Sequence, residues 1–363
     1  MHMQQRELDF FLGALSPTGF ASYYTQLVKD VNTQSPALLK AGPGCGKSTL
    51  LHRVAEHLEQ LKETVELIHC SADPDSLDGV ICAERGFSAV DATPPHALEP
   101  VYPIVFEDIV SLYRAVDRQK LQQHREELVA LFRQHKALTE RATRYITAAG
   151  SLLQDSMRVA LSCTNTEKAR AFAGALAHRY LPPAEGAGRE EVRLLSALTP
   201  RGLCFYRETI PKLADTVVVL DDEYGAASRI LLYTLRGLAL ERGYSIITCY
   251  CSMSPFEKIE HLFVPALRLC FATGNSWHPV SLPGQRTIHC TRFCSREGLR
   301  LRRQRLRFNK KAAQELFAQA VCVLQEAKAC HDGIEEFYKD ATDFSFLEKA
   351  YQYLIGTIRQ DPS

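Results

Sequence analysis

The sequence predicts an α/β protein built from two tandem domains, each with a parallel sheet and an added helical segment. Three observations lead to this prediction: β-rich runs alternate with amphipathic helices, the same order of elements occurs twice, and 363 residues suit two domains of ordinary size. The expected domains are 1–185 and 186–363, and the linker composition of Pro182–Gly188 supports this boundary.

An internal repeat supports the duplication. Short segments of the first half return in the second half in the same order, displaced by 181 to 183 residues. Several weak matches in one order are hard to obtain by chance, so the second half is expected to repeat the fold of the first. The recurring pairs are Gly13–Phe20 with Ser196–Leu203, Cys70–Pro74 with Cys251–Pro255, and His96 with His278.

Each half is expected to begin with a strand, an amphipathic helix and two further strands. Each half then becomes helical, over about 105–180 and about 303–360. In the first half, apolar spacing between Leu112 and Leu138 predicts long helices packed as a hairpin. The initial elements are expected at 37–40, 50–61, 65–68 and 87–90, and again at 216–220, 230–238, 245–248 and 267–271.

Charge and composition weigh against several function classes. Lys and Arg total 43 and Asp and Glu total 42, so the net charge does not indicate a nucleic acid or membrane partner. No apolar run of about 18 residues predicts a membrane span, and the first residues lack a signal-peptide core. The twelve cysteines lack the spacing of a disulfide framework and are expected to be reduced. We therefore expect a cytoplasmic protein.

The strongest chemical signal is the glycine-rich segment Ala41–Thr49, which lies between the first predicted strand and the first helix, as in a P-loop. Here the backbone N–H groups and the helix N-terminus create a phosphate site. Lys47 is expected to reach the β- and γ-phosphates, and the Ser48 hydroxyl to bind Mg²⁺. The predicted cofactors are ATP and Mg²⁺, and the predicted binding residues are Gly42, Pro43, Gly44, Cys45, Gly46, Lys47, Ser48 and Thr49.

A P-loop also needs a carboxylate at the end of a neighbouring strand to hold Mg²⁺. Asp91 ends the third predicted strand and is the expected Mg²⁺ ligand beside Ser48, the alternative being a turn-forming Asp. Asp73, Asp75 and Asp78 follow the second strand, at the edge where α/β proteins bind ligands. They are candidates to position water or a second substrate, or they form a turn and a helix cap. The predicted catalytic set is Lys47, Asp91, Asp73 and Asp75.

The second half lacks the parts of this site. Ala227 stands at the position of Lys47, and Thr273 at the position of Asp91. The segment Asp221–Glu223 brings negative charge to the loop where phosphate would bind. We expect a half that kept the fold and lost the nucleotide, which leaves one active and one degenerate site.

Other residues carry weaker signals. His96 recurs as His278 in the half without nucleotide chemistry, which favours a structural role for both. The basic run Arg286–Lys311 is interpreted first as a solvated or inter-domain face, with a nucleic-acid patch or a source of arginine for the γ-phosphate as alternatives. The cysteines between Cys249 and Cys294 lack the Cys-x-x-Cys spacing of a zinc site.

The chain resembles an uncharacterised bacterial family, mainly from Firmicutes, of tandem-duplicated P-loop ATPases. The resemblance covers nearly the whole chain and implies ATP binding and hydrolysis, with no established substrate. Both halves often carry a P-loop in that family, and this sequence departs from the pattern in its second half. The resemblance rests on Gly42–Thr49, His69–Asp78, Asp91–His96 and Ala329–Asp332.

The sequence thus predicts an ATP-binding P-loop protein that acts as a Mg²⁺-dependent ATPase and does not bind membranes. Two alternatives stay open: a small-molecule or nucleotide kinase with its acceptor near 69–78, and a nucleotide-gated binding or scaffold protein with a protein partner. Nucleic acid is a less favoured partner, because no aromatic residues of the single-strand-binding type interleave the basic run.

Overall fold

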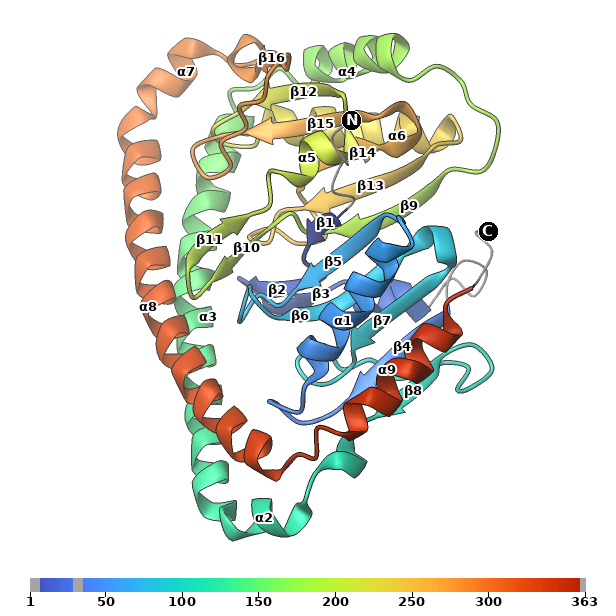
Figure 1. The fold of residues 1–363 in the computed structure, drawn as a ribbon. Coiled ribbons are helices and arrows are strands. Elements are labelled where there is room, and N and C mark those ends of the chain that lie inside the picture. The colour runs from blue at the N-terminus through green and yellow to red at the C-terminus, as the bar shows by residue number, and fades with distance from the viewer. Residues whose placement is uncertain (1–6, 29–34, 360–363) are drawn as a thin grey trace.

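The computed structural model describes residues 7–28 and 35–359. The chain forms two six-stranded mixed sheets, one from each half, with helices on their outer faces (Figure 1). The expected α/β class and the two similar halves are confirmed. Among the described residues, no helix is both long and apolar enough to cross a membrane.

Both sheets have the same strand order, which is the structural form of the sequence repeat. All six strands expected from the sequence are present, and each sheet gains three more. The first sheet contains, in spatial order, β1 (Glu7–Phe10), β5 (Val65–His69), β6 (Leu77–Cys82), β7 (Phe87–Asp91), β4 (Ser35–Lys40) and β8 (Asp108–Ser111). The second contains β9 (Arg189–Arg193), β13 (Ser245–Tyr250), β14 (Ile259–Val264), β15 (Leu269–Gly274), β12 (Thr216–Asp221) and β16 (Arg286–His289).

The expectation of purely parallel sheets is wrong at one strand of each sheet. Strand β6 is antiparallel to β5 and β7, and β14 is antiparallel to β13 and β15, while the other pairs are parallel. The connection 70–76 is too short for the crossover that parallel strands require, so β6 returns as a hairpin.

Nine α-helices are present among the described residues. Helix α1 follows the glycine-rich loop and buries the stripe Leu50, Leu51, Val54 and Leu58 against the first sheet, and α6 does the same on the second. The helices are α1 (Lys47–Gln60), α2 (Arg118–Gln123), α3 (Arg125–Leu161), α4 (Thr166–Tyr180), α5 (Thr209–Leu213), α6 (Ala227–Glu241), α7 (Arg296–Leu301), α8 (Arg303–Ala341) and α9 (Phe346–Thr357). Two small hairpins are β2 (Gly13–Ser16) with β3 (Gly19–Ser22), and β10 (Ser196–Thr199) with β11 (Gly202–Phe205).

The two longest helices pair across the halves, so the expectation of a helical hairpin within the first half is wrong. Helix α3 runs antiparallel to α8: the ring of His124, before α3, lies on Phe337, and Asp155 near the other end pairs with Arg305. The apolar stripe of α3 therefore has its partner in the second half of the chain.

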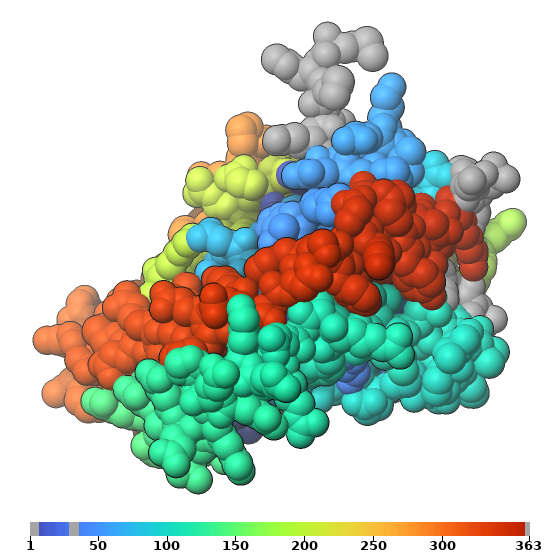
Figure 2. Space-filling model, turned by 60° about the horizontal axis from the view of Figure 1, so that its bottom comes forward, coloured from blue at the N-terminus to red at the C-terminus, as the bar shows by residue number. Residues whose placement is uncertain are grey.

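The last helix of each half packs against the sheet of the other half. Helix α4 lies on α6, where Ala173 and Leu176 join the core with Leu231. Helix α9 lies on α1, where Leu347 and Leu354 join the core of the first sheet. In Figure 2 the end of α8 and α9 cross the first half between α1 and the start of α3. Each sheet therefore depends on a helix that the other half supplies.

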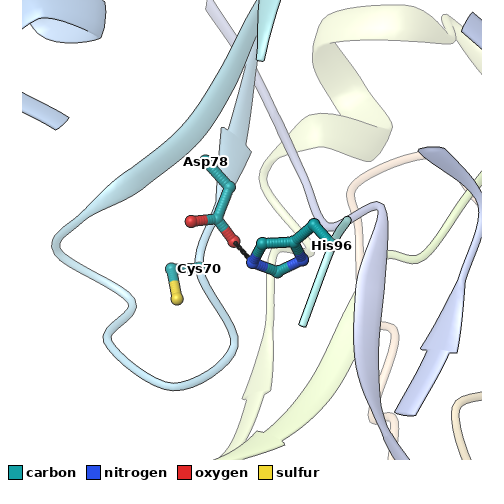
Figure 3. A group of neighbouring side chains, drawn as sticks. All are labelled: Cys70, Asp78 and His96. Atoms are coloured by element: carbon teal, nitrogen blue, oxygen red, sulfur yellow. Dashed lines mark ion pairs between the residues drawn. The ribbon is translucent and has the colours of Figure 1, made fainter. Parts of the chain in front are cut away.

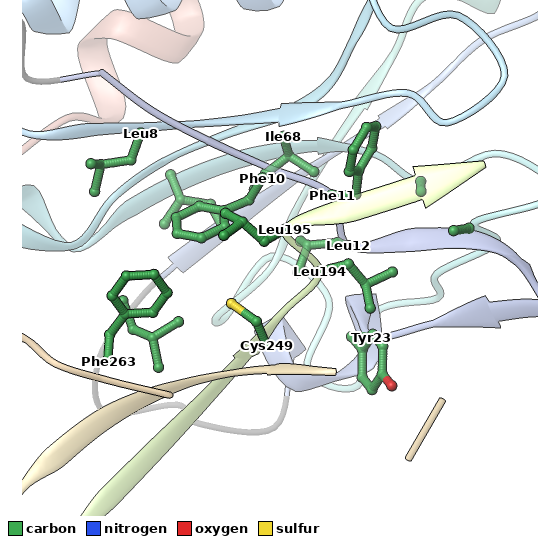
Figure 4. Close-up of a cluster of buried hydrophobic side chains, with 14 of the residues drawn as sticks. Leu8, Phe10, Phe11, Leu12, Tyr23, Ile68, Leu194, Leu195, Cys249 and Phe263 are labelled. Atoms are coloured by element: carbon green, nitrogen blue, oxygen red, sulfur yellow. The ribbon is translucent and has the colours of Figure 1, made fainter. Parts of the chain in front are cut away.

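The inner faces of the two sheets share one apolar core (Figure 4). Phe10 and Ile68 from the first half meet Cys249 and Phe263 from the second. In strand β12, Val217 and Val219 face this core, while Val218 and Leu220 face α6, as the two-residue period of a strand requires.

A single contact marks the symmetry between the halves. Phe11 and Leu194 exchange two backbone hydrogen bonds of 2.8 Å, and the sequence repeat makes them equivalent residues. A residue that contacts its own equivalent lies on a two-fold axis, so the halves are related by an approximate two-fold rotation.

A buried ion pair joins the sheets beside this axis. Arg193 at the end of β9 is almost fully buried, and its Nε lies 2.6 Å from Glu66 Oε2 on β5. Its Nη2 lies 2.7 Å from Glu191 Oε2. The pair links the halves through two charges that water cannot reach.

We predict that Arg193→Ala destabilises the protein by about 3–5 kcal/mol, because it leaves the Glu66 carboxylate buried without its partner. Urea unfolding measures the loss. The double variant Glu66→Leu with Arg193→Met removes both charges and is expected to recover most of the stability. A double variant as unstable as Arg193→Ala would show that packing, not the unpaired charge, is the cause.

Candidate functional site

The glycine-rich loop joins the end of β4 to the start of α1 at the carboxyl edge of the first sheet. Gly44 and Gly46 have φ values of 68° and 83°, which favour glycine. Lys47 is the first residue of α1, and its Nζ donates to the carbonyl oxygens of Ala41 (3.2 Å) and Gly42 (2.8 Å). The lysine thus folds back over the loop that precedes it.

Asp91 meets this lysine from the neighbouring strand. It ends β7, which pairs directly with β4, and its Oδ2 lies 3.5 Å from Lys47 Nζ. Its Oδ1 accepts hydrogen bonds from the backbone N–H and the hydroxyl of Thr93, at 2.9 and 2.5 Å. Burial raises the pKa of Asp91, and Lys47 opposes that rise. The structure therefore brings together two residues that the sequence places 44 positions apart.

The other predicted loop residues have different surroundings. Ser48 Oγ accepts a 3.0 Å hydrogen bond from the backbone N–H of Leu77, which ties the helix to the start of β6. Cys45 is buried in the core under α9, Pro43 is half-buried and Thr49 is exposed. Cys45 is therefore a packing residue. The Ser48 hydroxyl oxygen still has a free lone pair and lies next to Lys47 in the sequence.

The end of α8 and the start of α9 cover the loop. A Cβ added to Gly42 would lie 2.3 Å from Tyr338 Cε1, and one added to Gly44 would lie 2.7 Å from the Glu335 carbonyl oxygen. A Cβ on Gly46 would lie 2.5 Å from Leu347 Cδ1. All three loop glycines are thus in close contact with the second half, which the sequence pattern does not reveal.

The carboxylates after β5 do not gather around Lys47. Asp73 Oδ2 accepts from Ser76 Oγ (3.1 Å) and lies 3.5 Å from Lys328 Nζ of α8. Asp75 forms an ion pair with Arg201, which lies in the turn between β10 and β11. Both aspartates therefore hold cations that the second half brings to this edge of the sheet.

Asp78 belongs to a third arrangement, with Cys70 and His96 (Figure 3). Its Oδ2 lies 3.0 Å from His96 Nε2, and both side chains are buried. Burial opposes the charge of His96, but Asp78 raises its pKa above the ordinary value. Rings of Phe20 and Tyr24 pack on His96, so this histidine also fixes the loop after β7 to the sheet.

Sequence reasoning missed the residues that the second half contributes. Lys328, Glu335, Tyr338 and Arg201 reach the first-half site only because α8 and the β10–β11 hairpin cross to it. The basic run 286–311, in contrast, makes its contacts with α3, α4 and the second half: Arg305 with Asp155, Arg292 with Phe172 and Lys310 with Glu223. No local pattern in the sequence distinguishes the second-half residues that reach the first-half site from the basic residues of 286–311 that do not.

In the second half a carboxylate occupies the equivalent phosphate cradle. Asp222 is buried, and its two oxygens accept hydrogen bonds from the backbone N–H groups of Tyr224 (3.3 Å), Gly225 (3.1 Å) and Ser228 (2.8 Å). These N–H groups, from the loop and the first turn of α6, are at the positions from which a phosphate oxygen would be bound in a P-loop. The loop thus carries its own anion.

A half-buried lysine, Lys258, lies beside this loop. The Lys258 Nζ is 2.8 Å from Glu260 Oε2, and a Cβ on Gly225 would lie 2.6 Å from Lys258 Cε. Burial opposes both charges, yet Lys258 lowers the pKa of Glu260 to about 2. Glu260 also raises the pKa of Lys258. The ion pair therefore stays charged across the physiological pH range.

A cavity of about 790 Å³ opens next to the degenerate loop, between the second sheet and the helices α3 and α8. Its walls are mainly apolar, with Glu223, Lys258 and Lys310 among the charged residues that line it. This volume is in the range of small-molecule sites. Apolar side chains that line it include Met157, Leu198, Met253, Trp277, Phe317 and Val321.

No family model matches the chain, and neither a curated protein nor a solved structure matches it.

We predict that Gly42→Ala destabilises the protein by about 1–3 kcal/mol, because the added methyl group overlaps the Tyr338 ring. Its φ is not in the left-handed region, so the backbone itself tolerates alanine. In urea unfolding, the double variant with Tyr338→Ala should lose less than the sum of the two single losses. Gly44→Ala should not be rescued by Tyr338→Ala. If the losses in stability of Gly42→Ala and Tyr338→Ala simply add in the double variant, α8 does not cover the loop in solution.

Proposed function

We propose that the first half binds ATP with Mg²⁺ and hydrolyses it, and that the second half is a degenerate copy without a nucleotide. The observation that carries the proposal is Lys47 at the N-terminus of α1, 3.5 Å from the buried Asp91 on the adjacent strand. A strand, a glycine loop, a lysine at a helix start and a carboxylate on the next strand suit a nucleotide phosphate with its metal ion.

The residues present fit such a ligand. Backbone N–H groups of the loop and the start of α1 would hold the phosphates, and Lys47 would turn from the loop carbonyls to the β- and γ-phosphate oxygens. Ser48 and Asp91 would hold Mg²⁺, which neutralises charge on the phosphates. Because Asp91 is a buried carboxylate whose ion pair with Lys47 is long, at 3.5 Å, a bound cation would relieve the cost of its burial.

Cations from the second half lie at the same edge of the sheet as the loop. Lys328 pairs with Asp73 and Arg201 with Asp75, and their positive charge would favour an anionic ligand at this edge. Because both aspartates are already paired with cations, neither is free as a base for a hydroxyl acceptor, and we do not propose the kinase alternative. All twelve cysteines are free, so we also propose a reducing, cytoplasmic location.

A second candidate is a nucleotide-gated binding protein, which the cavity beside the degenerate loop favours. Helix α8 lines the cavity through Leu306, Phe317 and Val321 and reaches the first-half loop through Glu335 and Tyr338. A shift of this one helix would change both places together. The occupant would be a small amphipathic molecule, since the walls are mainly apolar and carry charges.

We predict that isothermal titration calorimetry finds one ATP per chain in the presence of Mg²⁺. Lys47→Ala should weaken binding about 10- to 100-fold, since a charged hydrogen bond contributes about 1.5–3 kcal/mol. Asp91→Asn should slow phosphate release while ATP still binds in EDTA. Ala227→Gly, at the equivalent position of the second half, should change neither the ATP affinity nor the rate of phosphate release. Unchanged ATP affinity in Lys47→Ala would refute the site.

For the second candidate, we predict that an anilinonaphthalene sulfonate probe binds the cavity and that saturating ATP changes its affinity at least about 5-fold. Ala318→Trp should block the probe, because Ala318 lines the cavity, whereas Ala329→Trp, exposed elsewhere on α8, should not. Lys47→Ala should abolish the effect of ATP. Probe binding that ATP leaves unchanged would rule out gating and leave the ATPase proposal intact.

A further inference from the structure

We propose that Cys70, Asp78 and His96 form a site for a transition-metal ion, with Zn²⁺ the best match, beside the nucleotide loop. The proposal is independent of ATP binding. A thiolate, an imidazole and a carboxylate are the three ligand types that Zn²⁺ takes in proteins.

The geometry of the three side chains suits one ion. One ligand atom from each lies within 4.8 Å of the others, and the Asp78 Oδ2 to His96 Nε2 distance is 3.0 Å. Two ligands at zinc bond lengths and the tetrahedral angle lie roughly 3.3 Å apart, so this pair is nearly in place. Figure 3 shows Asp78 and His96 facing each other, with Cys70 on the neighbouring loop. A small movement of the thiol completes the set.

The surroundings favour a cation. Asp78 and Asp91 are both buried carboxylates. Buried polar atoms without a hydrogen-bond partner include Tyr24 Oη and His96 Nδ1. A buried group of carboxylates and unpartnered polar atoms is costly unless an ion or further hydrogen bonds satisfy it.

The second half provides an internal comparison. Cys251, Glu260 and His278 stand at the equivalent positions, because β13 pairs with β14 in the register of β5 with β6. There the Lys258 ammonium lies 2.8 Å from Glu260, while His278 approaches Glu260 only to 3.6 Å through Nδ1 and bonds Ser196 through Nε2. The residue equivalent to Lys258 is Ser76: the carbonyl oxygens of both accept from the matching cysteine N–H.

The exchange of Lys258 for Ser76 indicates what a bound metal ion would do in the first half. The half with Lys258 supplies its own ammonium to the carboxylate, whereas in the half with Ser76 the ion-pair partner of the carboxylate is His96. Metal binding in the first half would displace the proton shared by His96 and Asp78 and the proton of the Cys70 thiol. Three protein ligands leave a fourth position for water or a substrate, as in catalytic rather than structural zinc sites.

The test measures metal bound to the full chain. Purified protein is loaded with Zn²⁺, dialysed and analysed by plasma mass spectrometry, and a parallel sample is loaded with Co²⁺. We expect one Zn²⁺ per chain and the intense visible bands of a four-coordinate cobalt thiolate. Cys70→Ser and His96→Gln should bring bound metal near zero.

Matched variants separate metal binding from folding and from nucleotide binding. Cys251→Ser and His278→Gln should keep the metal, and Lys47→Ala should keep it even though ATP binding is weakened. Ser76→Lys brings the second half's ammonium to Asp78 and should abolish metal binding with the circular dichroism spectrum unchanged.

Two results would overturn the proposal: no metal retained by the unaltered protein, or metal retained equally in Cys70→Ser and His96→Gln. If Cys70→Ser fails to fold, Ser76→Lys decides, and metal retained by a folded Ser76→Lys also overturns it.

Discussion

The burial of the two inner sheet faces against each other is the constraint on which the rest of the structure depends. Each sheet is apolar on both faces, and helices cover only the outer one. The remaining faces must meet, and the Phe11–Leu194 contact and the Arg193–Glu66 pair fix how they do so. The two long helices pack on each other along one flank of the molecule and on the two small hairpins (Figure 1).

This arrangement makes the candidate site a joint product of both halves. The first half supplies the glycine loop, Lys47 and Asp91, while the cover over the loop comes from the end of α8 and the start of α9. The approximate two-fold axis places α3 over the degenerate loop in the same way. A change at one loop can therefore reach the other through α3 and α8, which contact each other along their length.

The two halves differ in how they balance charge within one fold. In the second half Asp222 occupies the phosphate cradle and Lys258 neutralises Glu260, so both ionic positions are filled by the chain itself. In the first half Ala41 and Ser76 leave the corresponding positions without an internal ion, and Lys47, Asp91 and Asp78 remain to meet external ones. The contrast between the internal charges of one copy and the open positions of the other is what motivates both ligand proposals.

The sequence by itself determined the α/β class, the duplication and the strand–loop–helix context of Lys47, because these depend on local periodicity and on short-range turn chemistry. It also indicated Asp91, since a carboxylate at a strand end is a local feature. Only the tertiary structure decided that β6 and β14 run antiparallel, that α3 pairs with α8, that Tyr338 covers the glycine loop, and that Lys328 and Arg201 pair with Asp73 and Asp75. Those outcomes depend on which apolar faces pack together. Hydrophobic burial is not directional, so an apolar stripe in the sequence does not identify the surface against which it packs. The same reason explains why the sequence did not group Cys70 with Asp78 and His96, which come together only in the folded sheet.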